Sequence, residues 1–231
     1  MDAARSHQSR CPRVQREAAS GRETLMNIAV LTFDGFNEID SFVAASMLNR
    51  VKQPEMRALI VCPSERVTSM NGVIVHSQAP LHFAREADAV IVGSGVGTRD
   101  LVQMPEIMEQ MKLDPARQII GAQCSGALVL AKLGLLADVP ACTDSRTKPW
   151  VEEAGIEVLD QPFVAHGNVA TAGGCLASHY LAAWVIARLA GRKAAEDVLH
   201  YVAPVGQKQK YVEQAREVLS QYLPHSESVA V

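Results

Sequence analysis

The chain has 231 residues, 48% of them hydrophobic and 20% charged, which is enough apolar side chain for the core of a sizeable globular domain. Its formal net charge of −3 disfavours a nucleic-acid-binding surface, since such surfaces are basic. A membrane span is disfavoured too, because the apolar stretch 176–189 contains His179 and Arg188 and falls short of the ~20 residues that a span needs. We therefore expect neither nucleic acid nor a membrane as a partner.

Residues 1–25 differ from the rest of the chain, because they carry five arginines and little apolar side chain. They lack the apolar segment of a secretory signal, and their three acids argue against a transit peptide. We expect a disordered leader or a mis-assigned start, with Met26 as the true first residue. A single domain is expected over 26–223 and a flexible tail over 224–231.

Short apolar runs alternate with amphipathic stretches from residue 26 onward. The run 27–33 is almost continuously apolar, as expected of a strand buried on both faces, and Asp34-Gly35 ends it. Asn71-Gly72 predicts the turn of a hairpin. In this half we expect strands at residues 27–33, 57–62, 67–69, 73–76, 89–93 and 118–123, and helices at 38–51, 105–112 and 125–133.

The second half continues the pattern, and no internal repeat or low-complexity linker divides it from the first. Gly167-Asn168 predicts a turn between two of its strands. Repeated alternation of strands and helices indicates a mainly parallel sheet with helices on both faces. In this half we expect strands at residues 157–159, 163–166 and 169–171, and helices at 149–154, 176–190, 193–202 and 207–222.

The chain contains five cysteines, an odd number, and none forms a C-x-x-C pair. In a chain of this size that pattern favours reduced thiols and a cytoplasmic location over a disulfide framework. The seven histidines lie far apart in the sequence, and none stands at ligand spacing from a cysteine pair. We therefore expect no metal site.

The most informative motif is Ala122-Gln123-Cys124-Ser125-Gly126, which follows an expected strand and opens an expected helix. Small residues two before and two after a nucleophile are typical of a nucleophile elbow, whose tight turn exposes the reactive side chain. The helix N-terminus would favour an anion there and lower the pKa of Cys124. Buried packing of an inert thiol is the alternative interpretation.

Two other segments are expected at the same edge of the sheet, because ligands of open α/β sheets bind at the carboxyl ends of the strands. The glycine-rich loop of residues 94–98 could direct backbone N–H groups toward a developing negative charge, or could be a simple turn. Asp40 could cap its helix, or could point into an apolar crevice with a raised pKa and hold a proton.

Cys175 is the rival of Cys124, because it also stands at a junction between a loop and a helix, after Gly173-Gly174. It lacks the glycine that follows an elbow nucleophile, so packing is its simpler interpretation. It is also a candidate site-adjacent thiol. If it approaches Cys124, it could resolve an oxidised nucleophile as a disulfide.

Four segments in order resemble the ThiJ/PfpI superfamily, the glutamine-amidotransferase-like group, and within it the isonitrile (isocyanide) hydratase branch. The resemblance extends from about Met26 to Tyr222. It implies a flavodoxin-like three-layer α/β sandwich, a homodimer, a small-molecule substrate and no cofactor. The segments are NIAVLTFDGFNEID, DAVIVGSGVG, IIGAQCSGALVLAKLGLL and NVATAGGCLASHYLAAWVI.

The resemblance assigns Cys124 as the nucleophile and Asp40 as the acid of the loop after the first strand. Ser125 matches a position usually held by threonine, where its hydroxyl would position Asp40 or the intermediate. The backbone N–H groups of Gly95 and Ser125 match oxyanion donors, with Ser94 beside them.

The sequence also departs from the family pattern, and the family's Gly-Gly pair after the fourth strand is Gly93-Ser94-Gly95 here. Many relatives carry Thr-His near the segment that reads Thr143-Asp144 here, and the missing histidine disfavours protease or amidase action. Cys175 stands where hydratases tend to carry an aliphatic residue. The expected activity is hydration of isonitriles to N-substituted formamides. The alternatives are glyoxalase or deglycase activity on 2-oxoaldehydes, and a non-enzymatic thiol redox sensor.

Overall fold

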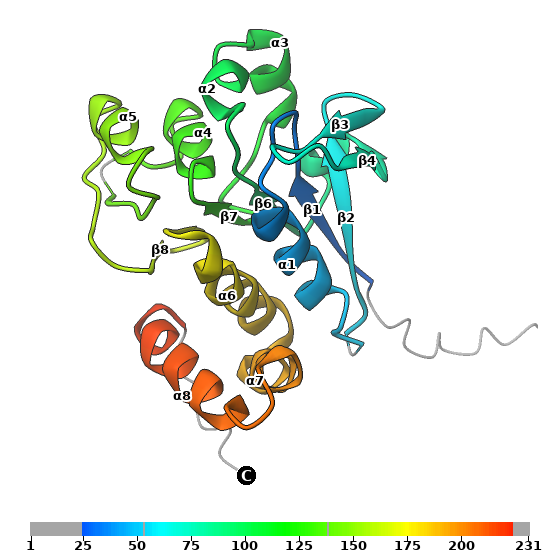
Figure 1. Cartoon of the computed structure of the whole chain (residues 1–231), viewed down its shortest axis with the longest axis vertical. Coiled ribbons are helices and arrows are strands. Elements are labelled where there is room, and N and C mark those ends of the chain that lie inside the picture. The colour runs from blue at the N-terminus through cyan, green and yellow to red at the C-terminus, as the bar shows by residue number, and fades with distance from the viewer. Residues whose placement is uncertain (1–24, 53, 138, 224–231) are drawn as a thin grey trace, which may run out of the picture.

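The computed structural model describes residues 25–52, 54–137 and 139–223 (Figure 1). Apart from Leu25, the expected leader at 1–25 lies outside the described residues, and so does the expected tail at 224–231. Among the described residues, no helix is long and apolar enough to cross a membrane.

A sheet forms the centre of the molecule (Figure 1). It has seven strands, in the order β5-β2-β1-β6-β7-β9-β8. Every neighbouring pair is parallel except β8 and β9, which form an antiparallel hairpin at one edge. The strands are β1 (Met26–Leu31), β2 (Met56–Cys62), β5 (Ala79–Pro80), β6 (Ala89–Val92), β7 (Ile119–Gln123), β8 (Phe163–His166) and β9 (Val169–Ala172).

The central strands are apolar on both faces because each face meets a separate hydrophobic cluster. Ile28 and Val30 of β1 belong to one cluster, whereas Ala29 and Leu31 belong to the other. This alternation follows from the two-residue period of a strand. All residues of β6 and β7 are buried, which is why their sequences read as unbroken apolar runs.

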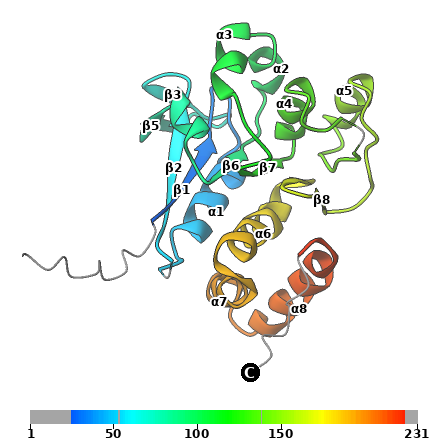
Figure 2. The same cartoon turned by 180° about the vertical axis from the view of Figure 1, so that it is seen from behind.

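Helices cover both faces of the sheet. On one face lie α1 (Glu38–Leu48) and α6 (Ser178–Ala190), and α7 (Arg192–Val202) and α8 (Lys208–Leu219) pack beyond α6 (Figures 1 and 2). The other face carries α2 (Thr98–Leu101), α3 (Pro105–Met108), α4 (Gly126–Lys132) and α5 (Lys148–Glu153). The flavodoxin-like sandwich expected from the sequence is confirmed.

Short 3₁₀ helices account for most differences at element ends. The helix expected at 105–112 is α3 followed by η2 (Glu109–Met111), and the helix expected at 176–190 begins as η3 (Cys175–Ala177) before α6. The last helix likewise ends as η4 (Ser220–Tyr222), and η1 (Leu81–Arg85) and α2 were not expected.

Two strand predictions need comment. The hairpin around Asn71-Gly72 is confirmed as β3 (Arg66–Thr68) and β4 (Ile74–His76), but it forms its own two-stranded sheet. The strand expected at 157–159 is wrong, because only Val158 pairs there, in an isolated bridge to Ala141.

Candidate active site

Cys124 occupies a strained turn between β7 and α4, as the elbow motif predicts. It has φ 46° and is the one non-glycine residue with positive φ among the described residues. L-residues adopt this left-handed region at a cost of about 1–2 kcal/mol, so the surrounding contacts must hold the turn. A Cβ on Gly126 would lie 2.6 Å from the carbonyl oxygens of Val92 and Gly93, which explains the glycine.

Three hydrogen bonds hold the elbow in place. The Cys124 N–H donates to the Ala172 carbonyl at 2.8 Å, and the Thr143 hydroxyl donates to the Cys124 carbonyl at 2.7 Å. Gln123 donates from Nε2 to the Gly174 carbonyl at 2.8 Å and lies 3.5 Å from the Cys124 sulfur. Sequence reasoning missed the role of Thr143, because its partner, Cys124, lies in a separate segment at the end of β7.

Asp40 lies in the first turn of α1 and is fully buried, so it points inward as the sequence suggested. Ser94 donates a short hydrogen bond to its carboxyl group, and Ser178 donates a second at 3.2 Å. Burial raises the pKa of Asp40, and hydrogen bonds from Ser94, Cys124, Ser178 and Cys175 offset part of that rise. The prediction of a raised pKa is confirmed.

The thiol of Cys124 does not have the lowered pKa that the helix N-terminus suggested. Burial raises the pKa of Cys124, and the nearby Asp40 and Cys175 raise it further. Burial and the two neighbouring groups therefore raise the pKa of Cys124 by more than the helix N-terminus lowers it. Ionising either group disfavours ionising the other, so the neutral forms of the buried pair are favoured.

The hydroxyl groups near the elbow are arranged differently from the sequence expectation. Ser125 Oγ accepts from the Gly95 N–H at 3.0 Å and lies 2.7 Å from Thr98 Oγ1, so it links the glycine-rich loop to the elbow. Ser94, rather than Ser125, contacts Asp40. The expected positioning of Asp40 by Ser125 is therefore wrong.

These hydrogen bonds also change which of the expected oxyanion donors are open to a substrate. The Gly95 N–H already has an acceptor in Ser125 Oγ, and Ser94 directs its hydroxyl to Asp40. Within the described part of the chain, the Ser125 N–H has no acceptor. Of the expected donors, the Ser125 N–H is thus the one open to a developing negative charge.

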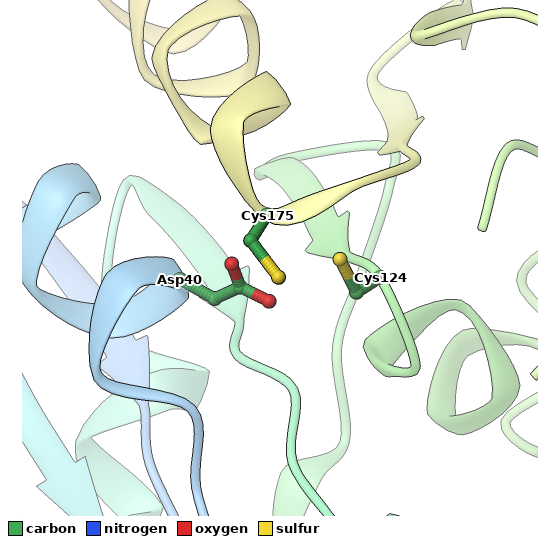
Figure 3. Close-up of side chains that lie close together, drawn as sticks. All are labelled: Asp40, Cys124 and Cys175. Atoms are coloured by element: carbon green, nitrogen blue, oxygen red, sulfur yellow. The ribbon is translucent and has the colours of Figure 1, made fainter. Parts of the chain in front are cut away.

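Cys175 joins the site, although packing was its simpler interpretation. Its sulfur, the Cys124 sulfur and a carboxyl oxygen of Asp40 all lie within 4.8 Å of one another (Figure 3). The side chains point toward a common centre from three separate segments (Figure 3). Asn37 donates from Nδ2 to the Cys175 sulfur at 3.0 Å while its Oδ1 accepts the Ile39 N–H at the start of α1.

Sequence reasoning missed Asn37 and Ser178 as site residues. Asn37 carries a signal that could have been used, since asparagine before a helix is a favoured N-cap. Ser178 is a polar residue at the start of an apolar helix, but nothing local links it to Asp40, 138 positions away.

The cluster of Asp40, Cys124 and Cys175 offers one carboxylate and two thiols as ligand atoms. Histidine and cysteine spacing gave no indication of it, because the three residues come from distant parts of the chain. Zinc accepts such ligands, and three protein ligands with an open position are typical of catalytic zinc. In the described residues the cluster fits a metal by donor type.

A cavity of about 470 Å³ opens beside Cys175. Its walls come from α1, η3, α6, α7 and α8, and most of the lining side chains are apolar. Burial lowers the pKa of His179, which lies in the wall, so the neutral imidazole is favoured there. The site thus joins a polar cluster to an apolar cavity.

The fold and the site define an α/β sandwich protein with a cysteine on a nucleophile elbow and a buried acid beside it. The sequence model of the DJ-1/PfpI family matches residues 26–188, and the chain belongs to that family. No curated protein matches the chain.

Several solved structures share the fold. Drosophila melanogaster DJ-1beta has a TM-score of 0.69 and 19% identity, over 78% of this chain and 98% of its own. Oxidized Toxoplasma gondii DJ-1 has a TM-score of 0.66 and 16% identity, over 77% and 97%. A DJ-1 superfamily protein from Salmonella typhimurium, crystallised as a cysteine-to-alanine mutant, has a TM-score of 0.64 and 24% identity, over 87% and 100%.

Proposed function

We propose that the protein hydrates isonitriles to N-substituted formamides, with Cys124 as nucleophile and Asp40 as acid. The observation that carries the proposal is the buried Asp40, whose pKa is raised by burial, beside the elbow thiol. The terminal carbon of an isonitrile accepts a nucleophile and a proton at the same atom. It therefore needs an acid next to the sulfur and no activation of a leaving group.

The reaction proceeds in two additions. The Cys124 thiol proton passes through Asp40 to the terminal carbon as the sulfur bonds to that carbon, which gives a thioimidate. The water oxygen then adds to the same carbon while Asp40 relays a water proton to the nitrogen. When the carbon–sulfur bond breaks, the remaining hydroxyl proton passes through Asp40 to the sulfur, so the formamide is released and the thiol is restored. The Ser125 N–H faces the oxygen that water contributes.

Among the described residues no histidine is paired with Cys124, and this separates the scheme from hydrolysis. Within the described residues, the groups that shift the pKa of Cys124 are Asp40, Cys175 and Gln123. A cysteine hydrolase uses a histidine both to activate the thiol and to protonate the leaving group. The Asp40–Cys124 pair instead supplies the proton that the terminal carbon of an isonitrile accepts.

The test is formation of a formamide from an aryl isonitrile by the purified, reduced protein. We expect turnover in the wild type, none in Cys124→Ala, and wild-type turnover in Cys62→Ser, which changes a buried thiol outside the cluster. A parallel assay with methylglyoxal tests the 2-oxoaldehyde alternative. Consumption of methylglyoxal without formamide formation would overturn the proposal in favour of that alternative.

The proposal includes a homodimer in the cytoplasm. Exposed apolar side chains on α1 and around the cavity, such as Ile39 and Leu176, offer surface for a second copy. The four described cysteines are free thiols, in keeping with a reducing compartment. Sedimentation of the purified protein is expected to give twice the monomer mass, and a monomer at micromolar concentration would contradict the assembly.

A further inference from the structure

Two cysteines from neighbouring strands end side by side, and the hydration scheme uses only one of them. β7 and β9 are parallel neighbours, with Gln123 opposite Ala172, so the loops that follow them share one edge of the sheet. These loops bring the Cys124 and Cys175 sulfurs within 4.8 Å of each other, and Figure 3 shows them pointing together. A disulfide requires about 2 Å, so the two side chains must move closer together to form one.

The surroundings of Cys175 suit a reactive thiol better than a packing residue. It is partly exposed and forms part of the wall of the apolar cavity, whereas Cys62 and Cys142 are buried. The Asn37 amide donates a hydrogen bond to its sulfur at 3.0 Å, which holds the Cys175 side chain at the site. The Asp40 carboxyl group, close to both sulfurs, can pass protons between them.

We propose that Cys124 and Cys175 form a redox pair through which the protein reduces organic hydroperoxides, using an external dithiol as reductant. The apolar cavity beside Cys175 favours an organic hydroperoxide over hydrogen peroxide, because it accommodates a hydrocarbon substituent. This activity is separate from isonitrile hydration and shares only Cys124 and Asp40 with it.

The first step oxidises Cys124. Its sulfur attacks the terminal oxygen of the hydroperoxide, an S–O bond forms and the O–O bond breaks. The alkoxide takes the thiol proton through Asp40 and leaves as an alcohol, so Cys124 becomes a sulfenic acid. The sulfur loses two electrons and the peroxide gains them.

The second step forms the disulfide. The Cys175 sulfur attacks the Cys124 sulfur, an S–S bond forms and the S–O bond breaks. The departing hydroxide takes the Cys175 proton and leaves as water. A dithiol reductant then restores both thiols and is itself oxidised to a disulfide. Cys175 thereby diverts Cys124 from further oxidation to sulfinic acid, which thiols do not reverse.

The test uses the full chain, with a chelator present and no isonitrile. One equivalent of cumene hydroperoxide is added to the reduced protein, free thiols are alkylated, and the peptides are mapped by mass spectrometry. We expect a peptide pair joined through Cys124 and Cys175 in the wild type and in Cys62→Ser. In Cys175→Ser we expect one or more oxygen atoms added at Cys124, and loss of sustained hydroperoxide reduction with dithiothreitol.

Two results would overturn the proposal. One is wild-type protein that accumulates sulfinic acid at Cys124 without the joined peptides. The other is sustained hydroperoxide reduction by Cys175→Ser equal to that of the wild type. The wild-type peptide map needs no variant, so it decides the question even if Cys175→Ser folds poorly. Since no isonitrile is present, failure here is distinct from failure of the hydration proposal.

Discussion

Asp40 combines full burial with hydrogen bonds from two serine hydroxyls, so its carboxyl group is held in place while its charge is disfavoured. A general acid of this kind contributes about 10²- to 10⁴-fold to a rate. We therefore expect Asp40→Asn to lower turnover of an isonitrile by about that factor, measured as kcat. Ser41→Ala is the matched control, because Ser41 is buried next to Asp40 in α1 and contacts Thr32 instead. Equal losses in both variants would contradict an acid role.

Asp40→Asn should also change how stability depends on pH. Because the folded pKa is raised, the contribution of this group is fully present below pH about 4 and is lost as the pH rises through the folded value. A neutral amide removes that loss. We expect the variant to gain free energy of unfolding relative to the wild type at pH 7 but not at pH 4, measured by urea unfolding. An equal difference at both pH values would contradict it.

At this scale the sequence indicated some site residues and not others, for a physical reason. Cys124 and Asp40 were predictable because each carries a local signal, an elbow motif and an acid in the first turn of a helix. Ser178 and Thr143 act through contacts with distant segments, which exist only once the strands are paired. The direction of the Cys124 pKa was wrong, because burial depends on the whole cluster.

At the scale of elements, the first turn of α4 determines where the Cys124 sulfur lies. Gly126 lets that turn approach the end of β6, and a Cβ there would meet two carbonyl oxygens at 2.6 Å. We expect Gly126→Ala to lower the free energy of unfolding by about 1–3 kcal/mol, since the helix must shift away. The displaced elbow should also reduce turnover by about 10²-fold. Urea unfolding and the formamide assay measure the two effects.

Gly134, just beyond the other end of α4, supplies the matched control. It has φ +73°, and a Cβ at this position would meet no atom within 4 Å, so Gly134→Ala adds backbone strain without a clash. We expect it to lose about 1–2 kcal/mol of stability and to keep its turnover. If both glycine variants lost stability and activity in proportion, general destabilisation rather than elbow position would explain the effect.

The elements themselves were predictable to different degrees. The strands β1, β6 and β7 were clear because burial on both faces leaves a continuous apolar run. The division of helix 105–112 into α3 and η2, and the presence of η1, leave no comparable pattern in a short segment. Residues 157–159 show the opposite error, since their composition predicted a strand that is not there. Only Val158 forms a bridge, to Ala141, because no neighbouring strand lies beside this segment.

At the scale of the whole molecule, groups held neutral in the interior limit stability at both ends of the pH range. Burial lowers the pKa of His179 from its ordinary 6.5. The ring contacts the Leu176 carbonyl and lies against the rings of Tyr180 and Tyr211, with no carboxylate among these contacts. The unfolded chain binds a proton more readily, so stability falls as the pH drops below about 6.5. We expect His179→Gln to flatten that fall in urea unfolding.

The loss of stability at high pH follows from the buried thiols. Burial raises the pKa of Cys142 from 9.0 to about 12, and also raises the pKa values of Cys62 and Cys124. Above pH 9 the unfolded chain releases these protons while the folded chain retains them. The free energy of unfolding should therefore decrease by up to about 1.4 kcal/mol per pH unit for each thiol. Cys142→Ala should reduce that slope by one thiol's share in urea unfolding between pH 8 and 10, and an unchanged slope would show that Cys142 ionises as readily in the folded protein.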